Sequence, residues 1–217
     1  MEFVKICGLK KSEEIKLCIE KDAFAVGFIY NVPESPRNLG KQELLKLLEV
    51  VNKNILTVIV CKPVNISELI KIMNDIEADL YQIHPQFELV EIKKLDRNLR
   101  MKIIVAIKLS YKNKNQIMTQ INQIYGDVYG ILLDNSEGSG KAFNFNLIKQ
   151  FLKKYSKAKI ILAGGININN VEKVYRELNP YGIDVSSALE SEKGIKDLKK
   201  LEDFLIKIEE INNYSRV

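Results

Sequence analysis

The stretch F-V-K-I-C-G-L-K-K-S-E-E-I-K-L-C-I-E, Phe3 to Glu20, contains one complete strand-and-helix pattern. Its first residues, Phe3–Cys7, form a short run rich in aromatic and β-branched side chains, which is typical of a strand, and Gly8 ends the run. From Ser12 onward the apolar side chains follow helical spacing, at Ile15, Cys18 and Ile19. The stretch therefore predicts a strand followed closely by an amphipathic helix.

The same pattern recurs along the whole chain. Strand-like runs lie at Phe3–Cys7, Ala23–Tyr30, Ile55–Cys61, Leu80–His84, Met101–Leu109, Val128–Asp134, Ala158–Gly165 and Gly182–Ser187. Helical patterns follow them, from Ser12, around Leu44–Val51 and Ile66–Met73, and at Phe87–Leu95, Asn115–Tyr125, Asn146–Tyr155, Asn169–Leu178 and Asp197–Ile211. Eight such units with short connections predict one domain, residues 1–217, folded as an α/β protein of the (β/α)8 TIM barrel type with parallel strands. A doubly wound open sheet uses the same units and is the main alternative.

The composition is that of an ordinary globular protein. The chain has 217 residues, of which 46% are hydrophobic and 28% are charged, and its net charge is +5. Because basic and acidic residues alternate along the helical stretches, a mixed solvated surface is expected rather than a nucleic-acid site. No apolar run resembles a signal peptide or approaches the roughly 20 residues of a membrane span. We therefore expect neither a nucleic-acid nor a membrane partner, and a small positive excess suits an anionic substrate.

The cysteines and the histidine limit which disulfides and metal sites the chain can form. Cys7, Cys18 and Cys61 are an odd number and widely separated, which predicts reduced thiols and a cytoplasmic protein. His84 is the only histidine, and no cysteine pair has ligand spacing, so no metal site is expected. Cys18 and Cys61 are interpreted as core residues, whereas Cys7 closes a strand.

The residues at the strand ends are the main candidates for an active site, because active sites in this fold lie at the carboxyl ends of the strands. Gly164 and Gly165 follow the seventh strand, and Ser186 and Ser187 close the eighth. Glycines let backbone N–H groups approach an anion closely, and barrel enzymes often bind phosphate with the loops after strands seven and eight. These four residues predict a phosphate site.

Two proton-transferring groups also fall at strand ends. Cys7 closes the first strand and Asp134 the sixth, so a closed barrel would place them on opposite sides of its mouth. A thiol and a carboxyl group facing one substrate suit an isomerisation, in which one takes a proton while the other gives one. Lys5 shares the strand parity of Cys7 and should point into the barrel, where Asp184 on the neighbouring last strand is its expected partner.

Short motifs occur in order along nearly the whole chain. They are K-I-C-G (Lys5–Gly8), S-P-R (Ser35–Arg37), Q-I-H (Gln82–His84), L-L-D (Leu132–Asp134), G-S-G-K-A-F (Gly138–Phe143), A-G-G-I (Ala163–Ile166) and D-V-S-S (Asp184–Ser187). Together they resemble the phosphoribosylanthranilate isomerases of tryptophan biosynthesis. The combination of K-I-C-G with D-V-S-S is the most specific part of the resemblance.

The resemblance implies an Amadori rearrangement of N-(5-phosphoribosyl)anthranilate to 1-(o-carboxyphenylamino)-1-deoxyribulose 5-phosphate, with no metal or cofactor. It implies that Asp134 is the general acid that opens the ribose ring and that Cys7 is the general base that removes the proton on C2. Arg37 would pair with the anthranilate carboxylate, since its planar fork matches that group. The resemblance further implies a phosphate site at Gly164, Gly165, Ser186 and Ser187, and a pocket lined by His84 and Asp184. The partner expected is the phosphorylated substrate, for a monomer or homodimer.

The chain departs from the family pattern in places, and other functions stay open. The loop after Asp134, expected to close over a ligand, is shorter than in the family, and Ala188 replaces a glycine. Another phosphate-binding barrel enzyme, such as an indole-glycerol-phosphate synthase or a Schiff-base aldolase using Lys108, is one alternative. A non-catalytic barrel that only binds a phosphorylated ligand is the second.

Overall fold

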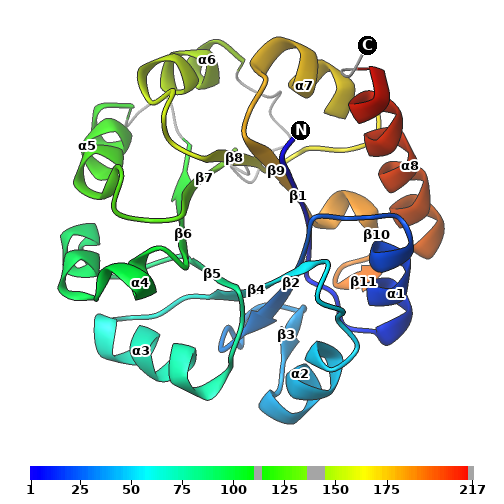
Figure 1. The fold of residues 1–217 in the computed structure, drawn as a ribbon, viewed down its shortest axis with the longest axis horizontal. Coiled ribbons are helices and arrows are strands. Elements are labelled where there is room, and N and C mark those ends of the chain that lie inside the picture. The colour runs from blue at the N-terminus through cyan, green and yellow to red at the C-terminus, as the bar shows by residue number, and fades with distance from the viewer. Residues whose placement is uncertain (110–113, 136–144, 215–217) are drawn as a thin grey trace.

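Eight parallel strands close into a barrel in the computed structural model, which describes residues 1–109, 114–135 and 145–214. The barrel strands are β1 (Phe3–Cys7), β2 (Ala25–Tyr30), β4 (Leu56–Cys61), β5 (Leu80–Ile83), β6 (Ile103–Lys108), β7 (Gly130–Asp134), β8 (Ile160–Ala163) and β9 (Gly182–Val185). The first strand, β1, pairs with β2 on one side and with the last barrel strand, β9, on the other, so the ring has no free edge (Figure 1). The closed barrel is therefore confirmed over the open sheet.

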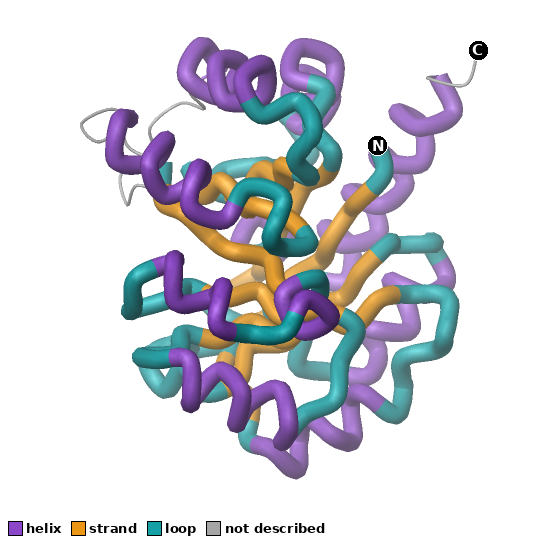
Figure 2. Tube along the Cα trace, turned by 60° about the vertical axis from the view of Figure 1, so that its left-hand side comes forward, coloured by secondary structure: helices purple, strands orange, loops and turns teal. Residues whose placement is uncertain are grey.

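Helices surround this ring (Figures 1 and 2). They are α1 (Ser12–Glu20), α2 (Lys41–Leu48), α3 (Ile66–Asp75), α4 (Arg97–Arg100), α5 (Lys114–Ile124), α6 (Phe145–Lys154), α7 (Val171–Leu178) and α8 (Leu198–Tyr214). The first begins at Ser12 as expected, where the buried Glu14 carboxylate accepts the backbone N–H groups of Lys10 and Lys11 at 2.7 and 3.1 Å. None of the helices within the described ranges is long and apolar enough to cross a membrane.

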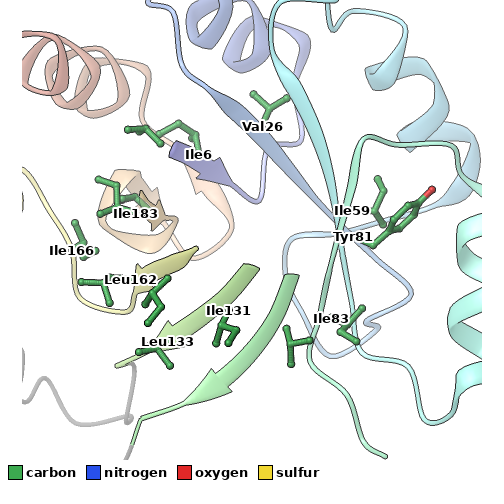
Figure 3. Packing of buried hydrophobic residues seen from close by; sticks show 14 of the residues in the cluster. Ile6, Val26, Ile59, Tyr81, Ile83, Ile131, Leu133, Leu162, Ile166 and Ile183 are labelled. Atoms are coloured by element: carbon green, nitrogen blue, oxygen red, sulfur yellow. The ribbon is translucent and has the colours of Figure 1, made fainter. Parts of the chain in front are cut away.

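Alternation along the strands divides the core into two layers. Outward-pointing side chains pack between strands and helices, and Figure 3 shows several of them, among them Ile6, Val26 and Ile59. Inward-pointing side chains fill the barrel, and they include Phe3, Ala25, Val58, Leu80, Ile104, Leu132 and Ile161. This inner layer is apolar toward the amino ends of the strands. Lys5, Gln82 and Asp184, all buried, follow toward the carboxyl ends, so polar groups collect on one side of the barrel.

The prediction of an α-helix at Phe87–Leu95 is wrong. The segment instead forms a 3-10 helix, η1 (Leu89–Lys94), and α4 follows it as a single short turn. Its buried residues, Leu89, Ile92 and Leu95, recur every three positions. That period matches the three residues per turn of a 3-10 helix rather than the 3.6 of an α-helix.

Two small additions were not expected from the sequence. The short strand β3 (Asn38–Leu39) extends the sheet beside β2. After β9, the 3-10 helix η3 (Ser187–Leu189) leads into an antiparallel hairpin of β10 (Glu190–Glu192) and β11 (Ile195–Lys196). Both additions lie next to residues of the candidate site, because Arg37 precedes β3 and Ser187 begins the 3-10 helix that leads into the hairpin.

Candidate active site

A cavity of about 240 Å³ lies at the carboxyl ends of the strands. Every site residue expected from the sequence lines it: Cys7, Arg37, His84, Asp134, Gly164, Gly165, Asp184, Ser186 and Ser187. These residues come from six barrel strands and the loops that follow them, so the closure of the barrel is what brings them together. Gln82 also lines the cavity, and sequence reasoning gave it no role.

Cys7 and Asp134 contribute a thiol and a carboxylate to this one cavity. In the ring, β1 and β7 are separated by β9 and β8, which places the two residues on different sides of the cavity. Cys7 is 5% exposed, and its burial raises the pKa of its thiol although nearby Lys5 lowers it. Asp134 is half-buried and sits beside Lys108, its register partner on β6.

The ion pair expected between Lys5 and Asp184 is confirmed. Lys5 Nζ donates to Asp184 Oδ1 at 2.7 Å, and the lysine side chain is fully buried. Burial opposes the charge of Lys5, but the attraction of Asp184 and of the Cys7 thiol outweighs it and raises the pKa of the ammonium. The interior of the barrel therefore holds a fixed positive charge near Cys7.

Arg37 has a partner that the sequence did not indicate. Its Nε lies 2.6 Å from Glu190 Oε1 and its Nη2 lies 2.7 Å from Glu190 Oε2. The same carboxylate accepts the Gly194 backbone N–H and the buried Lys196 ammonium, each at 3.0 Å. Burial alone would raise the pKa of Glu190, but these donors lower it to about 2. Lys196 also donates to the carbonyl of Ser186 at 3.0 Å, so one network joins Arg37 to the expected phosphate loop.

Gln82 lies in β5 (Leu80–Ile83) and His84 follows the end of this strand, with both side chains on the same face. Their Nε2 atoms lie 3.4 Å apart, and the Gln82 Oε1 atom is buried without a hydrogen-bond partner among the described residues. Burial lowers the pKa of His84, against the opposing influence of Asp134. The imidazole is therefore neutral at pH 7 and can donate or accept a hydrogen bond. A polar residue at the inward position between Leu80 and His84 is the signal that could have identified Gln82.

The expected phosphate residues form one wall of the cavity. Gly164 and Gly165 have φ angles of 81° and 76°, a backbone conformation that favours glycine. After the neighbouring strand β9, Ser186 immediately precedes η3 and Ser187 begins it. The positive-φ residues other than glycine in the described part of the chain are Asp22, Asn31 and Asn179, so the alanine at position 188 carries no such strain.

The remaining candidates fall outside this cavity. Cys18 and Cys61 are both fully buried, and burial raises the pKa of each to about 12, as expected of core thiols. Lys108 is exposed and lines a neighbouring cavity of about 500 Å³ that shares only His84 with the first. The described residues contain no group of three or more His, Cys, Asp or Glu side chains that could hold a metal ion. The loop G-S-G-K-A-F, residues 138–143, lies outside the described residues.

Comparison with known proteins identifies the family. The profile described as N-(5'phosphoribosyl)anthranilate (PRA) isomerase matches residues 4–207. The chain belongs to this isomerase family. Its curated relatives include an N-(5'-phosphoribosyl)anthranilate isomerase of Aquifex aeolicus, 35% identical over 94% of this chain and 97% of the relative. Another from a Thermoanaerobacter species is 34% identical over 96% of this chain and 98% of the relative.

Solved structures of the isomerase family share the barrel. The phosphoribosyl anthranilate isomerase of Thermotoga maritima has a TM-score of 0.82 and 26% sequence identity, and the match covers 97% of this chain and 100% of that chain. The family match includes all nine residues that the sequence assigned to the site, since they lie between positions 7 and 187. The resemblance inferred from the short motifs is therefore confirmed at the level of the family.

Proposed function

We propose that this chain isomerises N-(5-phosphoribosyl)anthranilate to 1-(o-carboxyphenylamino)-1-deoxyribulose 5-phosphate, a step of tryptophan biosynthesis. The observation that carries the proposal is the joint placement of Cys7 and Asp134 around one cavity, in a chain that belongs to this isomerase family. The volume of this cavity, about 240 Å³, suits the reacting sugar. An arginine and a glycine-rich wall at the same cavity suit the two anionic ends of the substrate.

The proposed reaction proceeds by proton transfer alone. Asp134 protonates the ring oxygen of the ribose, the bond between that oxygen and C1 breaks, and the ring opens to an iminium ion. Cys7 then removes the proton on C2, which gives an enolamine, and the enolamine tautomerises to the ketone. The protons lost and gained balance, so these steps need no metal or cofactor.

The surroundings of Cys7 fit the order of these steps. Because burial raises its pKa, Cys7 carries its proton in the free protein at neutral pH. An iminium ion beside it brings a positive charge into the cavity and acidifies the C2 proton at the same time. The thiolate is therefore stabilised at the stage when a base is needed.

Substrate binding is assigned to the groups at the rim. The N–H groups and hydroxyls of Gly164, Gly165, Ser186 and Ser187 would bind the phosphate. Arg37 would bind the anthranilate carboxylate through the Nη1–Nη2 edge, because Glu190 takes Nε and the adjacent side of Nη2. His84 and Asp184 would line the sugar.

The same proposal covers the setting of the enzyme. We expect residues 1–217 to act as a single domain, as a monomer or homodimer, with the phosphorylated substrate as its partner and without nucleic acid or membrane. Its three cysteines are free thiols, which suits the cytoplasm.

The test is a coupled assay with the purified protein. Anthranilate, phosphoribosyl pyrophosphate and a phosphoribosyl transferase generate the substrate, and loss of its fluorescence reports turnover. Turnover by the wild type and its loss in Asp134→Asn support the proposal. Binding of a product analogue without turnover would indicate a non-catalytic barrel instead. A borohydride-trapped adduct at Lys108 would indicate a Schiff-base enzyme.

A further inference from the structure

Lys5 occupies the barrel interior directly below Cys7. The two residues are separated by one position on β1, so their side chains leave the same face of the strand. Lys5 is fully buried, and its ammonium donates to Asp184 at 2.7 Å. The charge of Lys5 is therefore held on the same side of the barrel as the thiol.

A glycine on the neighbouring strand makes room for this arrangement. Gly27 of β2 is the register partner of Cys7. A Cβ atom added to Gly27 would lie 2.8 Å from Lys5 Cε, 3.1 Å from Lys5 Nζ and 3.2 Å from Cys7 Cα. The ammonium and the backbone of Cys7 therefore border one small space, which any larger residue at position 27 would fill.

Stability alone gives a weak reason for this ion pair. Moving two charges out of water costs free energy that their attraction offsets only in part, and apolar side chains of similar size often stabilise an interior as well. The pair also lies at the level where the barrel interior changes from apolar to polar. Its position beside a thiol points to a role in the chemistry of that thiol.

Other charges also face Cys7. They are Asp184 on β9, Lys196 on β11 and Arg37 in the segment after β2, whereas β2 itself presents Gly27. Burial and Asp184 oppose a negative charge on the sulfur, and Lys5 and Lys196 favour it. Lys5 is the strongest of the favouring groups, and its influence exceeds that of Asp184.

We infer that Lys5 is a positioning residue for the base: its buried ammonium stabilises the Cys7 thiolate that removes the C2 proton. The inference rests on the proposed function, which makes Cys7 the base. Lys5 keeps its own protons and acts through its charge, while the proton of the thiol passes to solvent at the mouth of the cavity. Asp184 in turn holds the ammonium in place.

Alkylation of Cys7 by iodoacetamide, followed across pH by peptide mass spectrometry, tests the inference without using the reaction. Only the thiolate reacts, so the rate reports its population. In Lys5→Met the midpoint of the Cys7 profile should rise by one pH unit or more, which is about tenfold slower alkylation at any lower pH. Lys41→Met is the matched control, because it removes an exposed lysine that pairs with Asp75 at 2.9 Å on the surface. Its profile should be that of the wild type.

A second variant protects the test against misfolding. Lys5→Met leaves Asp184 buried without its partner, so Lys5→Met/Asp184→Asn removes both charges together. Its midpoint should also rise, by less than in Lys5→Met, because the influence of Lys5 on the thiol exceeds that of Asp184. An unchanged midpoint in a folded variant, judged by its circular dichroism, overturns the inference.

The coupled assay separates this inference from the proposed function. For Lys5→Met we expect the limb of kcat/KM that rises with pH to move in the alkaline direction together with the alkylation midpoint. If the wild type has no isomerase activity, the proposed function fails, whatever the thiol does. If the wild type is active and the limb does not move in Lys5→Met, the proposed function stands and the role of Lys5 is refuted.

Discussion

Glu190 holds the guanidinium of Arg37 side-on, through contacts of 2.6 Å to Nε and 2.7 Å to Nη2. The exposed fractions of these side chains are only 5% for Glu190 and 16% for Arg37, so solvent screens the pair weakly. Arg37 lies in the segment between β2 and β3, and Glu190 follows the last barrel strand. The contact therefore holds the long side chain of Arg37, which comes from the loop after β2, against the segment that follows β9.

Replacing Glu190 with glutamine should weaken substrate binding. The variant keeps the shape of the side chain but loses its charge, so the hold on Arg37 weakens by the roughly 1.5–3 kcal/mol of a charge-assisted hydrogen bond. We expect KM to rise by about tenfold or more while kcat changes little. Glu192→Gln, at an exposed position of the same short strand, is the control. An unchanged KM in Glu190→Gln would show that Arg37 needs no such support.

The same carboxylate predicts a pH dependence of stability. The pKa of Glu190 is lowered from 4.5 to about 2 in the folded protein, so the unfolded chain takes up the proton first as the pH falls. The contribution of Glu190 to the free energy of unfolding is complete above pH 4.5, the pKa of this group in the unfolded chain. It disappears as the pH falls from 4.5 toward 2. Urea unfolding across that window should show a shallower pH dependence for Glu190→Gln than for the wild type. Equal slopes would rule out this contribution.

Substitution of the two proposed proton-transfer residues, Cys7 and Asp134, should affect turnover more than substrate binding. Cys7→Ser and Asp134→Asn each remove one proposed acid–base group, which typically contributes about 10²–10⁴-fold to the rate. We expect kcat to fall by that order in each variant, with affinity for a product analogue preserved. Cys61→Ser, which alters a buried thiol outside the cavity, serves as the control for kcat. Turnover at the wild-type rate in either site variant would exclude that residue from the mechanism.

Gly8 offers a test of how closely Arg37 packs against β1. Its φ is 79°, and an added Cβ would lie 2.5 Å from Arg37 Cδ. Gly126 has the same φ but open space around it, so Gly126→Ala isolates the backbone strain. Both alanine variants should lose about 1 kcal/mol of stability from that strain. Gly8→Ala should also raise KM, since Arg37 must move, and equal kinetics in the two variants would contradict the contact.

Periodicity identified the fold because each strand–helix unit is a local pattern. The Lys5–Asp184 pair followed from two simple rules, strand parity and the closure of the ring between the first and last strands. The exception, at 87–95, arose because an apolar spacing of three fits a 3-10 helix as well as one face of an α-helix. A segment this short contains too few helical turns for its apolar periodicity to distinguish a 3-10 helix from an α-helix.

The site was predicted in its residues but not in its internal contacts. Strand ends and motifs identified Cys7, Asp134 and Arg37, because chemistry-bearing residue types stand out in apolar runs. The Arg37–Glu190 contact joins positions 153 residues apart through a hairpin that lacks a strong strand pattern. Nothing in the local sequence distinguishes Glu190 from a surface glutamate, so its role becomes visible only in three dimensions.

The contact between Lys5 and Asp184 joins residues 179 positions apart, on the first and last strands of the barrel. A ribosome synthesises β1 well before β9, the strand that pairs with it on this side. During synthesis the surroundings of the Cys7 thiol are therefore incomplete until β9 has been made. A polypeptide that ended before β9 would hold Cys7 without the Lys5–Asp184 ion pair that we propose supports its role as a base.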